Sequence, residues 1–300
     1  MNTWIYLVLL SEIMWALTSL IDKIMLSKNY IKSPFVFIVF NGLMNILLVF
    51  LLPFFSFGKL GAADIFISLA AGIFLTLGVI FYYKAVQNEE ISRVLIMWQF
   101  TPIFVLLFSF LFLGDILTSN YLIGFLLLLA GGLAVSYKKM KGSFKLSRAF
   151  YCMLASTALI SVYYVSSAHI YKSTGFWSAF MWLRLASFSS VLLLLVPKIR
   201  KEFFETWKIM RRNSKFLITS KMIIDFSAFI ILGLAIIKGP IALISALGSA
   251  AAPIFIFLIT LFTTIFLPQI IKEDISRKTI LIKILAIALT IIGIVFVNYN

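Results

Sequence analysis

The chain has 300 residues, of which 62% are hydrophobic and only 12% charged, and its mean hydropathy is +1.09. A soluble domain of this length carries roughly a quarter charged residues, so this chain has too little charge to cover a water-facing surface. In a soluble protein the net charge of +15 would suggest nucleic acid. Here the basic residues lie between apolar segments, where anionic lipid headgroups attract them, and this position disfavours nucleic-acid binding.

Ten apolar stretches follow one another along the chain, each close to the length of about 20 residues that a helix needs to cross a hydrocarbon core. The first is too long for the apolar region of a signal peptide and has no basic residue before it, so we expect it to remain as a span. Most linkers are short, so neighbouring helices should run antiparallel. The predicted spans are 3–26, 33–52, 64–86, 91–113, 118–137, 149–170, 176–197, 216–237, 240–267 and 279–298.

One linker, residues 197–214, differs from the others. It places Phe203, Phe204, Trp207 and Met210 among Lys, Arg and Glu. This pattern is typical of a short amphipathic helix that lies on the headgroups. A basic interfacial anchor is the favoured interpretation, and a regulatory role is the alternative.

The basic residues are divided unequally between the two membrane faces. The loops after spans 1, 3, 5, 7 and 9 hold 22 of the 26 Lys and Arg, whereas the loops after spans 2, 4, 6 and 8 hold Lys59, Lys172 and Lys238. The positive-inside rule places the richer side in the cytoplasm. We therefore predict a multi-pass protein of the plasma membrane whose two termini face outward.

The order of the spans suggests an internal repeat. Five spans per half is an odd number, so two similar halves would have opposite orientations in the membrane. Pro102 in span 4 and Pro253 in span 9 are each followed by a Phe-rich run. We predict an all-α membrane protein with one five-helix repeat over residues 1–140, a basic linker over 141–148 and a second, inverted repeat over 149–300. Inverted repeats of this kind place a substrate site near the midplane between the halves.

A series of short motifs carries a family resemblance. Ala85-Val86, the run Glu90–Val94, Thr101-Pro102 and Leu113-Gly114-Asp115 follow one another at short intervals. This series resembles the EamA-type pattern of the drug/metabolite transporter superfamily, and Asp22-Lys23 in the first span is similar to the same family. The resemblance implies a ten-helix secondary transporter and export rather than import of its substrate.

Glu12 is the first ionisable residue that lies deep in a span, roughly 14 Å from the start of that helix. It shares one helix face with Trp15 and Ser19. The sequence around it also looks like the first helix of small multidrug-resistance transporters, in which a glutamate at this place exchanges protons for cationic drugs. Because a charged carboxylate is costly at this depth, we predict that Glu12 lines the central cavity and couples transport to protons. The alternative is a permanent pair with a buried basic group.

Two more ionisable residues lie within the later spans. Arg184 lies roughly 12 Å into span 7 and matches an arginine often found in the seventh span of EamA-type proteins. Its planar donor fork could hold a substrate carboxylate or serve as the standing partner of Glu12. Asp225, near the middle of span 8, could be a second proton or cation site or the partner of Arg184.

Further candidates are polar and aromatic. Gln99 and Thr101, beside Trp98, carry polar groups that need partners in lipid, so we expect them to face a cavity. Tyr163 and Tyr164 could stack on an aromatic or cationic ligand, although most aromatics in such spans pack or anchor at the interface.

No catalytic signature is present in the sequence. It lacks a nucleophile elbow, a phosphate-cradling loop and a cluster of metal ligands, and its one cysteine, Cys152, excludes an internal disulfide. We expect neither enzymatic activity nor a cofactor.

The sequence thus favours a secondary transporter of a small organic metabolite, such as an amino acid, that works by alternating access with proton coupling. A multidrug or choline-like quaternary-amine transporter is the alternative substrate class. An intramembrane enzyme and a structural membrane partner are the alternative functional classes. The expected partners are the small-molecule substrate, protons and a bilayer with anionic headgroups.

Overall fold

The computed structural model describes residues 2–27, 33–55, 58–88, 94, 97–136, 148–266 and 277–298. Within these ranges the chain is helical and has no strand, which confirms the predicted all-α class. The predicted linker 141–148 lies outside the described residues except for Arg148, and so does the stretch 90–93 of the motif series.

The helices follow the predicted apolar segments closely. The first half of the chain contains α1 (Thr3–Ser27), α2 (Pro34–Leu43) with its 3-10 continuation η1 (Met44–Phe50), α3 (Ala62–Asn88), α5 (Phe100–Phe108) with its π-helical continuation η2 (Ser109–Leu113), and α6 (Ser119–Ser136). The second half contains α7 (Arg148–Ser173), α8 (Phe176–Ser187) with its 3-10 continuation η3 (Phe188–Leu195), α9 (Pro197–Ile209), α10 (Arg212–Lys238), α11 (Ile241–Phe266) and α12 (Arg277–Asn298).

Seven segments of the described chain are long and apolar enough to cross a membrane. They are Thr3–Asp22, Ala62–Val86, Arg148–Ser173, Phe176–Leu195, Arg212–Lys238, Ile241–Phe262 and Ile280–Val297. Three shorter apolar helices, Phe35–Phe50, Phe100–Leu113 and Ser119–Ala134, coincide with predicted spans 2, 4 and 5.

Local chemistry explains where several helices begin and end. Pro34 and Pro197 occupy the first turn of α2 and α9, where a missing backbone N–H costs nothing. The π-helical turn η2 ends at Gly114, whose φ of 68° is the left-handed conformation that glycine adopts without steric cost. Pro34 thus sets the start of α2, which lines the cavity described below.

The short helix α9 confirms the helix predicted in the basic linker. Its Ile199 and Phe203 are buried, whereas Phe204 and Trp207 are exposed. The Phe203 ring lies 4.8 Å from the ring of Phe40 in α2. One side of α9 therefore packs on the bundle, and Trp207 at its border lies 6.0 Å from the Phe40 ring although it is partly exposed.

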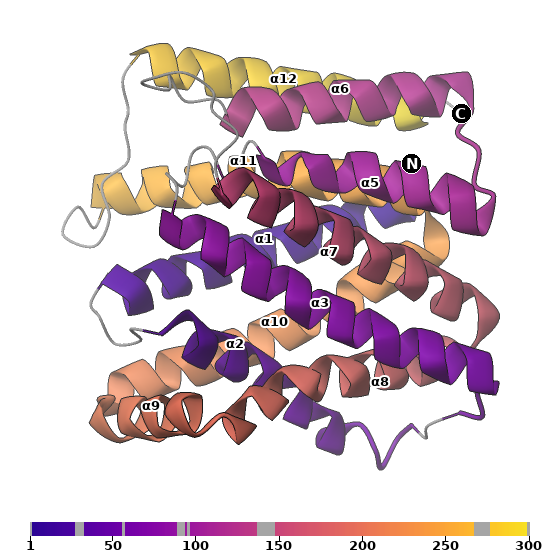
Figure 1. Cartoon of the computed structure of the whole chain (residues 1–300). Coiled ribbons are helices and arrows are strands. Elements are labelled where there is room, and N and C mark those ends of the chain that lie inside the picture. Colours follow the sequence, from indigo (N-terminus) through magenta and orange to yellow (C-terminus); the bar gives the residue numbers. More distant parts are fainter. Residues whose placement is uncertain are drawn as a thin grey trace.

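The helices run side by side as a layered bundle (Figure 1). At one edge α6 packs on α12, and at the opposite edge α2 packs on η3 and α9. Between these edges, α3 packs on α7 and α1 packs on α10, while α5 packs on α7 and α11 packs on α1. The pairing is reciprocal when the short helix α9 is left out of the order, because α1 then packs on the third and fourth helices of the second half, and α7 packs on the third and fourth helices of the first.

Two contacts fix the relative positions of distant segments. The chain ends lie at the same end of the bundle (Figure 1), where the Asn2 side chain donates to the Val297 carbonyl at 3.5 Å. Gly72 of α3 faces the backbone of Ala186 in α8, and a Cβ at Gly72 would lie 2.3 Å from that backbone. The glycine therefore permits the close crossing of α3 and α8 beside the cavity described below.

Candidate functional site

A cavity of about 270 Å³ lies between α1, α2, η1 and α3 of the first half and α8, η3 and α10 of the second half. Most of its lining is apolar or neutral, including Trp15 and Ser19 of α1 and Phe229 of α10. Drug-sized ligands occupy pockets of about 300–1,000 Å³, so this cavity suits a smaller molecule, of the size of an amino acid.

Three charged side chains of the lining and one amide form a group that we name the Lys221 cluster: Lys221, Asp22, Asp225 and Asn41. The Lys221 ammonium donates to Asn41 Oδ1 at 2.9 Å and to Asp225 Oδ2, and it lies 3.6 Å from Asp22 Oδ1. The Lys221 side chain is only 5% exposed, so these charges are largely withdrawn from solvent. Four ionisable or polar groups from α1, α2 and α10 therefore meet at one wall of the cavity.

The local sequence explains how the Lys221 cluster forms. Lys221 and Asp225 are four residues apart and so lie on one face of α10. Packing of α1 on α10 then brings Asp22, near the end of α1, to the same place. Sequence reasoning found Asp225 but counted Lys221 with the basic loop before its span. The four-residue spacing of Lys221 and Asp225 within one apolar segment was the signal that could have identified the pair.

Of the candidates named from the sequence, Trp15, Ser19 and Asp225 line this cavity. The Trp15 ring lies 5.2 Å from the Phe229 ring in an edge-on arrangement, and Ser19 Oγ donates to the Trp15 carbonyl at 2.8 Å. Asp225 forms an ion pair with Lys221. A pair with Arg184 was one of the two roles predicted for this aspartate, and it is not the pair that forms. The remaining candidates lie elsewhere.

Glu12 is buried, with 6% of its surface exposed, and it does not line this cavity. Its carboxyl group faces α11, where a Cβ added at Gly248 would lie 2.7 Å from Glu12 Oε1. Among the described residues no ion pair joins Glu12 to Arg184, so the structure does not contain the standing pair that the sequence left open.

Arg184 is almost fully buried, with 1% of its surface exposed. Its Nη2 donates to the Tyr163 hydroxyl, and its guanidinium carbon lies 3.9 Å from the centre of the Phe229 ring. Nε and Nη1 have no hydrogen-bond partner. Arg184 does not itself line the cavity, but the Phe229 ring on which it rests does.

The other polar and aromatic candidates are packing residues in this structure. Gln99 donates to the Ser249 carbonyl of α11 at 3.2 Å, and buried Thr101 has no partner for its hydroxyl. The Trp98 ring packs edge-on against Tyr82 with 5.3 Å between ring centres, and Tyr164 packs against Tyr163 at 6.1 Å. None of the candidates Trp98, Gln99, Thr101, Tyr163 and Tyr164 lines the cavity.

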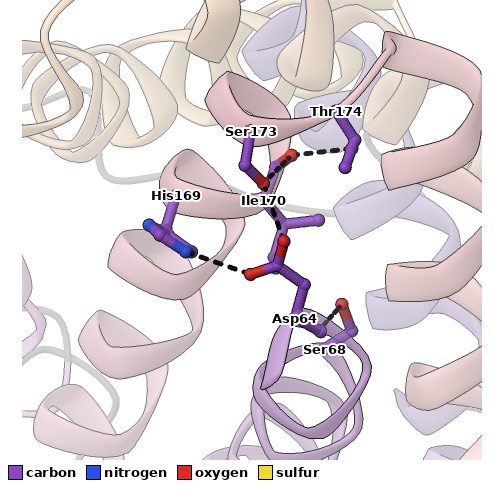
Figure 2. A network of polar contacts seen from close by, with 6 residues as sticks. All are labelled: Asp64, Ser68, His169, Ile170, Ser173 and Thr174. Atoms are coloured by element: carbon purple, nitrogen blue, oxygen red, sulfur yellow. Dashed lines mark hydrogen bonds and ion pairs between the residues drawn. The ribbon is translucent and has the colours of Figure 1, made fainter. Parts of the chain in front are cut away.

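A second set of polar contacts joins the start of α3 to the end of α7 (Figure 2). His169 Nε2 lies 3.2 Å from Asp64 Oδ1, and Ser173 Oγ donates to Asp64 Oδ2 at 3.3 Å. Beside them, Lys172 Nζ lies 3.4 Å from Asp115 Oδ1, just beyond η2. These contacts link the two halves at the end of the bundle where the termini lie (Figure 1).

Comparison with known proteins agrees with this architecture. The model of the EamA-like transporter family matches residues 2–137, which confirms the resemblance read from the motif series. A solved structure titled "Crystal structure of protein" is 17% identical, with a TM-score of 0.68 and a match that covers 98% of each chain. No curated protein matches the chain. The family match and the apolar helices identify a multi-pass membrane protein, and the chain shares its fold over both halves with the solved structure.

Proposed function

We propose that the protein is a secondary transporter that moves a small organic metabolite by alternating access, because the model of the EamA-like transporter family matches residues 2–137. The observation that carries the proposal is the cavity, since α1, α2 and α3 of the first half and α8 and α10 of the second half all line it. A site between two halves is accessible from either face when the halves rock against each other.

The reciprocal helix pairing supports a transporter built from two inverted five-helix repeats. Helix α1 packs on α10 and α7 packs on α3, and the last helices of the two halves, α6 and α12, pack on each other. Two halves related by a twofold axis in the membrane plane have this pattern of contacts. Superposition of the halves should then align Pro102 with Pro253. The orientation, with both termini outward, rests on the distribution of basic residues.

The proposed substrate is an amino acid or a similarly small polar metabolite. The cavity volume suits such a molecule, and its wall combines charged groups with the rings of Trp15 and Phe229. The two rings also support the alternative of a quaternary amine, because aromatic faces attract organic cations. Proton coupling through Glu12 remains a hypothesis from the sequence and has its own test below.

The test is transport by purified protein in liposomes, with a panel of labelled amino acids and quaternary amines. Ser19→Phe places a ring in the cavity and should abolish most uptake of any substrate found. The matched control is Ser227→Phe on α10, because Ser227 does not line the cavity and its hydroxyl only donates to the Ile223 carbonyl. Uptake by Ser19→Phe at the rate of the unmodified protein would show that the cavity is not the transport site.

A further inference from the structure

The Lys221 cluster contains more negative than positive charge. An ammonium group has three N–H donors, and Lys221 donates two hydrogen bonds, to Asn41 and Asp225. Its third donor lies 3.6 Å from Asp22, beyond hydrogen-bond distance, and an incoming carboxylate would meet two carboxylates of the protein around this ammonium. With two carboxylates around one ammonium, the cluster has a net charge of −1 when all three groups are ionised.

Asp22 is the less firmly held of the two carboxylates. Its Oδ1 lies 3.6 Å from Lys221 Nζ and has no hydrogen-bond partner, whereas Asp225 accepts a hydrogen bond from Lys221 directly. The Asp22 side chain is 29% exposed and that of Asp225 is 9% exposed. Both line the cavity, so a molecule inside it can pair with Asp22 while the Lys221–Asp225 pair stays intact.

An uncompensated charge within a membrane span is costly, so the cluster favours a second cation. A proton on Asp22 supplies one form of compensation, and a positively charged group on a ligand supplies another. The rings of Trp15 and Phe229, which line the same cavity, provide apolar surface for the rest of such a ligand.

We propose that the cavity binds small molecules through an organic ammonium group, which pairs with Asp22 and displaces a proton from it. The O–H bond of the Asp22 carboxyl breaks, the proton leaves to water, and the ammonium N–H groups donate to the freed carboxylate. One positive charge replaces another, so the charge of the cavity does not change. The inference rests on the proposed function, because only in a transporter does this replacement become exchange across a membrane.

The surroundings of Asp22 are consistent with this assignment. The titratable side chains that face it come from α10 and α3 and are Lys221, Asp225, Tyr82 and Tyr83. Tyrosine hydroxyls are neutral at physiological pH, so among the side chains that the structure describes here the lysine is the one cation. Helix α11, which also packs on α1, has no charged residue, and α2 contributes the neutral Asn41.

The binding test uses phenethylamine as the probe and the neutral 2-phenylethanol as its isostere, with purified protein in detergent. Calorimetric titration in two buffers of different ionisation enthalpy counts the protons released on binding. We expect phenethylamine to bind more tightly than the alcohol, to release protons, and to lose up to about tenfold in affinity per pH unit as acid protonates Asp22.

Variants assign the effect to one residue. Asp22→Asn should weaken phenethylamine binding by at least about tenfold, which corresponds to about 1.4 kcal/mol, and should abolish proton release. Asp22→Glu should restore both, which also guards against a variant that fails to fold. Glu205→Gln is the matched control, because Glu205 is 63% exposed on α9 and does not line the cavity, and it should change neither. Equal binding in the unmodified protein and Asp22→Asn, or no proton release between about pH 5 and 8, would overturn the inference.

Transport measurements separate this inference from the proposed function. If liposomes transport a neutral or anionic metabolite and Asp22→Asn transports it equally well, the inference fails and the transporter function stands. If phenethylamine binds at Asp22 but neither it nor any panel member crosses the liposome membrane, the binding site stands and the transporter function fails.

Discussion

Two regions in the middle of the bundle contain buried ionisable groups, and they are built differently. In the Lys221 cluster, opposite charges from α1 and α10 lie within 4 Å of each other and line a cavity. The second region, which we name the Arg184 region, consists of Arg184, Tyr163 and Phe229, while Glu12 is buried against α11. There the cation rests on an aromatic ring and one hydroxyl, no carboxylate pairs with it among the described residues, and neither Arg184 nor Glu12 reaches the cavity.

The difference shows that depth in a span identifies a costly group but not its role. Both regions satisfy the rule that charges in a membrane face protein rather than lipid. Only the Lys221 cluster adds access from a cavity and an acceptor without a hydrogen bond, as a binding site requires. The Arg184 region instead supports the cavity wall from behind, through Phe229.

The largest expected effect comes from removal of the lysine. Lys221→Met leaves Asp22 and Asp225 facing each other without a cation, and breaking a buried pair in this way typically costs about 3–5 kcal/mol. Thermal unfolding in detergent should show a large fall in the midpoint. Adding Asp225→Asn to the same chain should recover much of the loss, because one carboxylate is then neutral. Lys208→Met, at an exposed position on α9, is the control and should change little. If Lys221→Met lowered the unfolding midpoint only slightly, the ion pairs of the Lys221 cluster would not be the stronger of the two arrangements.

A smaller effect is expected in the Arg184 region. Tyr163→Phe removes the one hydroxyl to which the guanidinium donates, and an unsatisfied buried donor costs about 1–3 kcal/mol. The unfolding midpoint should fall by less than in Lys221→Met, and phenethylamine binding should persist. Tyr164→Phe, at the neighbouring position, is the matched control. If Tyr163→Phe abolished binding without unfolding the protein, the Arg184 region would belong to the site.

The smallest expected effect on binding is that of Glu12→Gln. The carboxyl group does not line the cavity, so phenethylamine affinity should stay within about threefold of the unmodified protein, as for separate sites that share no partner. The hypothesis from the sequence makes a different prediction for transport, namely that Glu12→Gln abolishes uptake driven by a pH gradient. Gradient-driven transport that survives in this variant would remove Glu12 as the coupling group.

The course of the helices was predictable because the length and polarity of each segment are local properties. The segment 3–26 was predicted as a span and α1 runs over Thr3–Ser27, and the predicted amphipathic segment after Pro197 contains α9. Gly114, the glycine of the Leu113-Gly114-Asp115 motif, ends η2.

The composition of the site was much less predictable. Helices such as α3 and α10 have apolar side chains on every face, because both lipid and neighbouring helices are apolar, so their sequences do not mark the inward face. Glu12 and Arg184 were conspicuous by depth alone. Lys221 lies nearer the end of its helix and was counted as a loop charge, and Asp22 was noticed only within a family motif. Lys221 and Asp22 come together because α1 packs on α10, and this tertiary contact cannot be predicted from the local sequence of either helix.

The contacts between the halves near the chain termini have a consequence for the rocking motion that the proposed function requires. The side chains of His169 and Lys172 are 44% and 49% exposed, and contacts as accessible as theirs with Asp64 and Asp115 are typically worth about 0–1 kcal/mol each. Together they favour this arrangement of the two halves by no more than roughly 30-fold in population. Thermal motion can break contacts of this strength. Because salt screens accessible charges, we expect a higher ionic strength at this end of the bundle to weaken the Lys172–Asp115 pair.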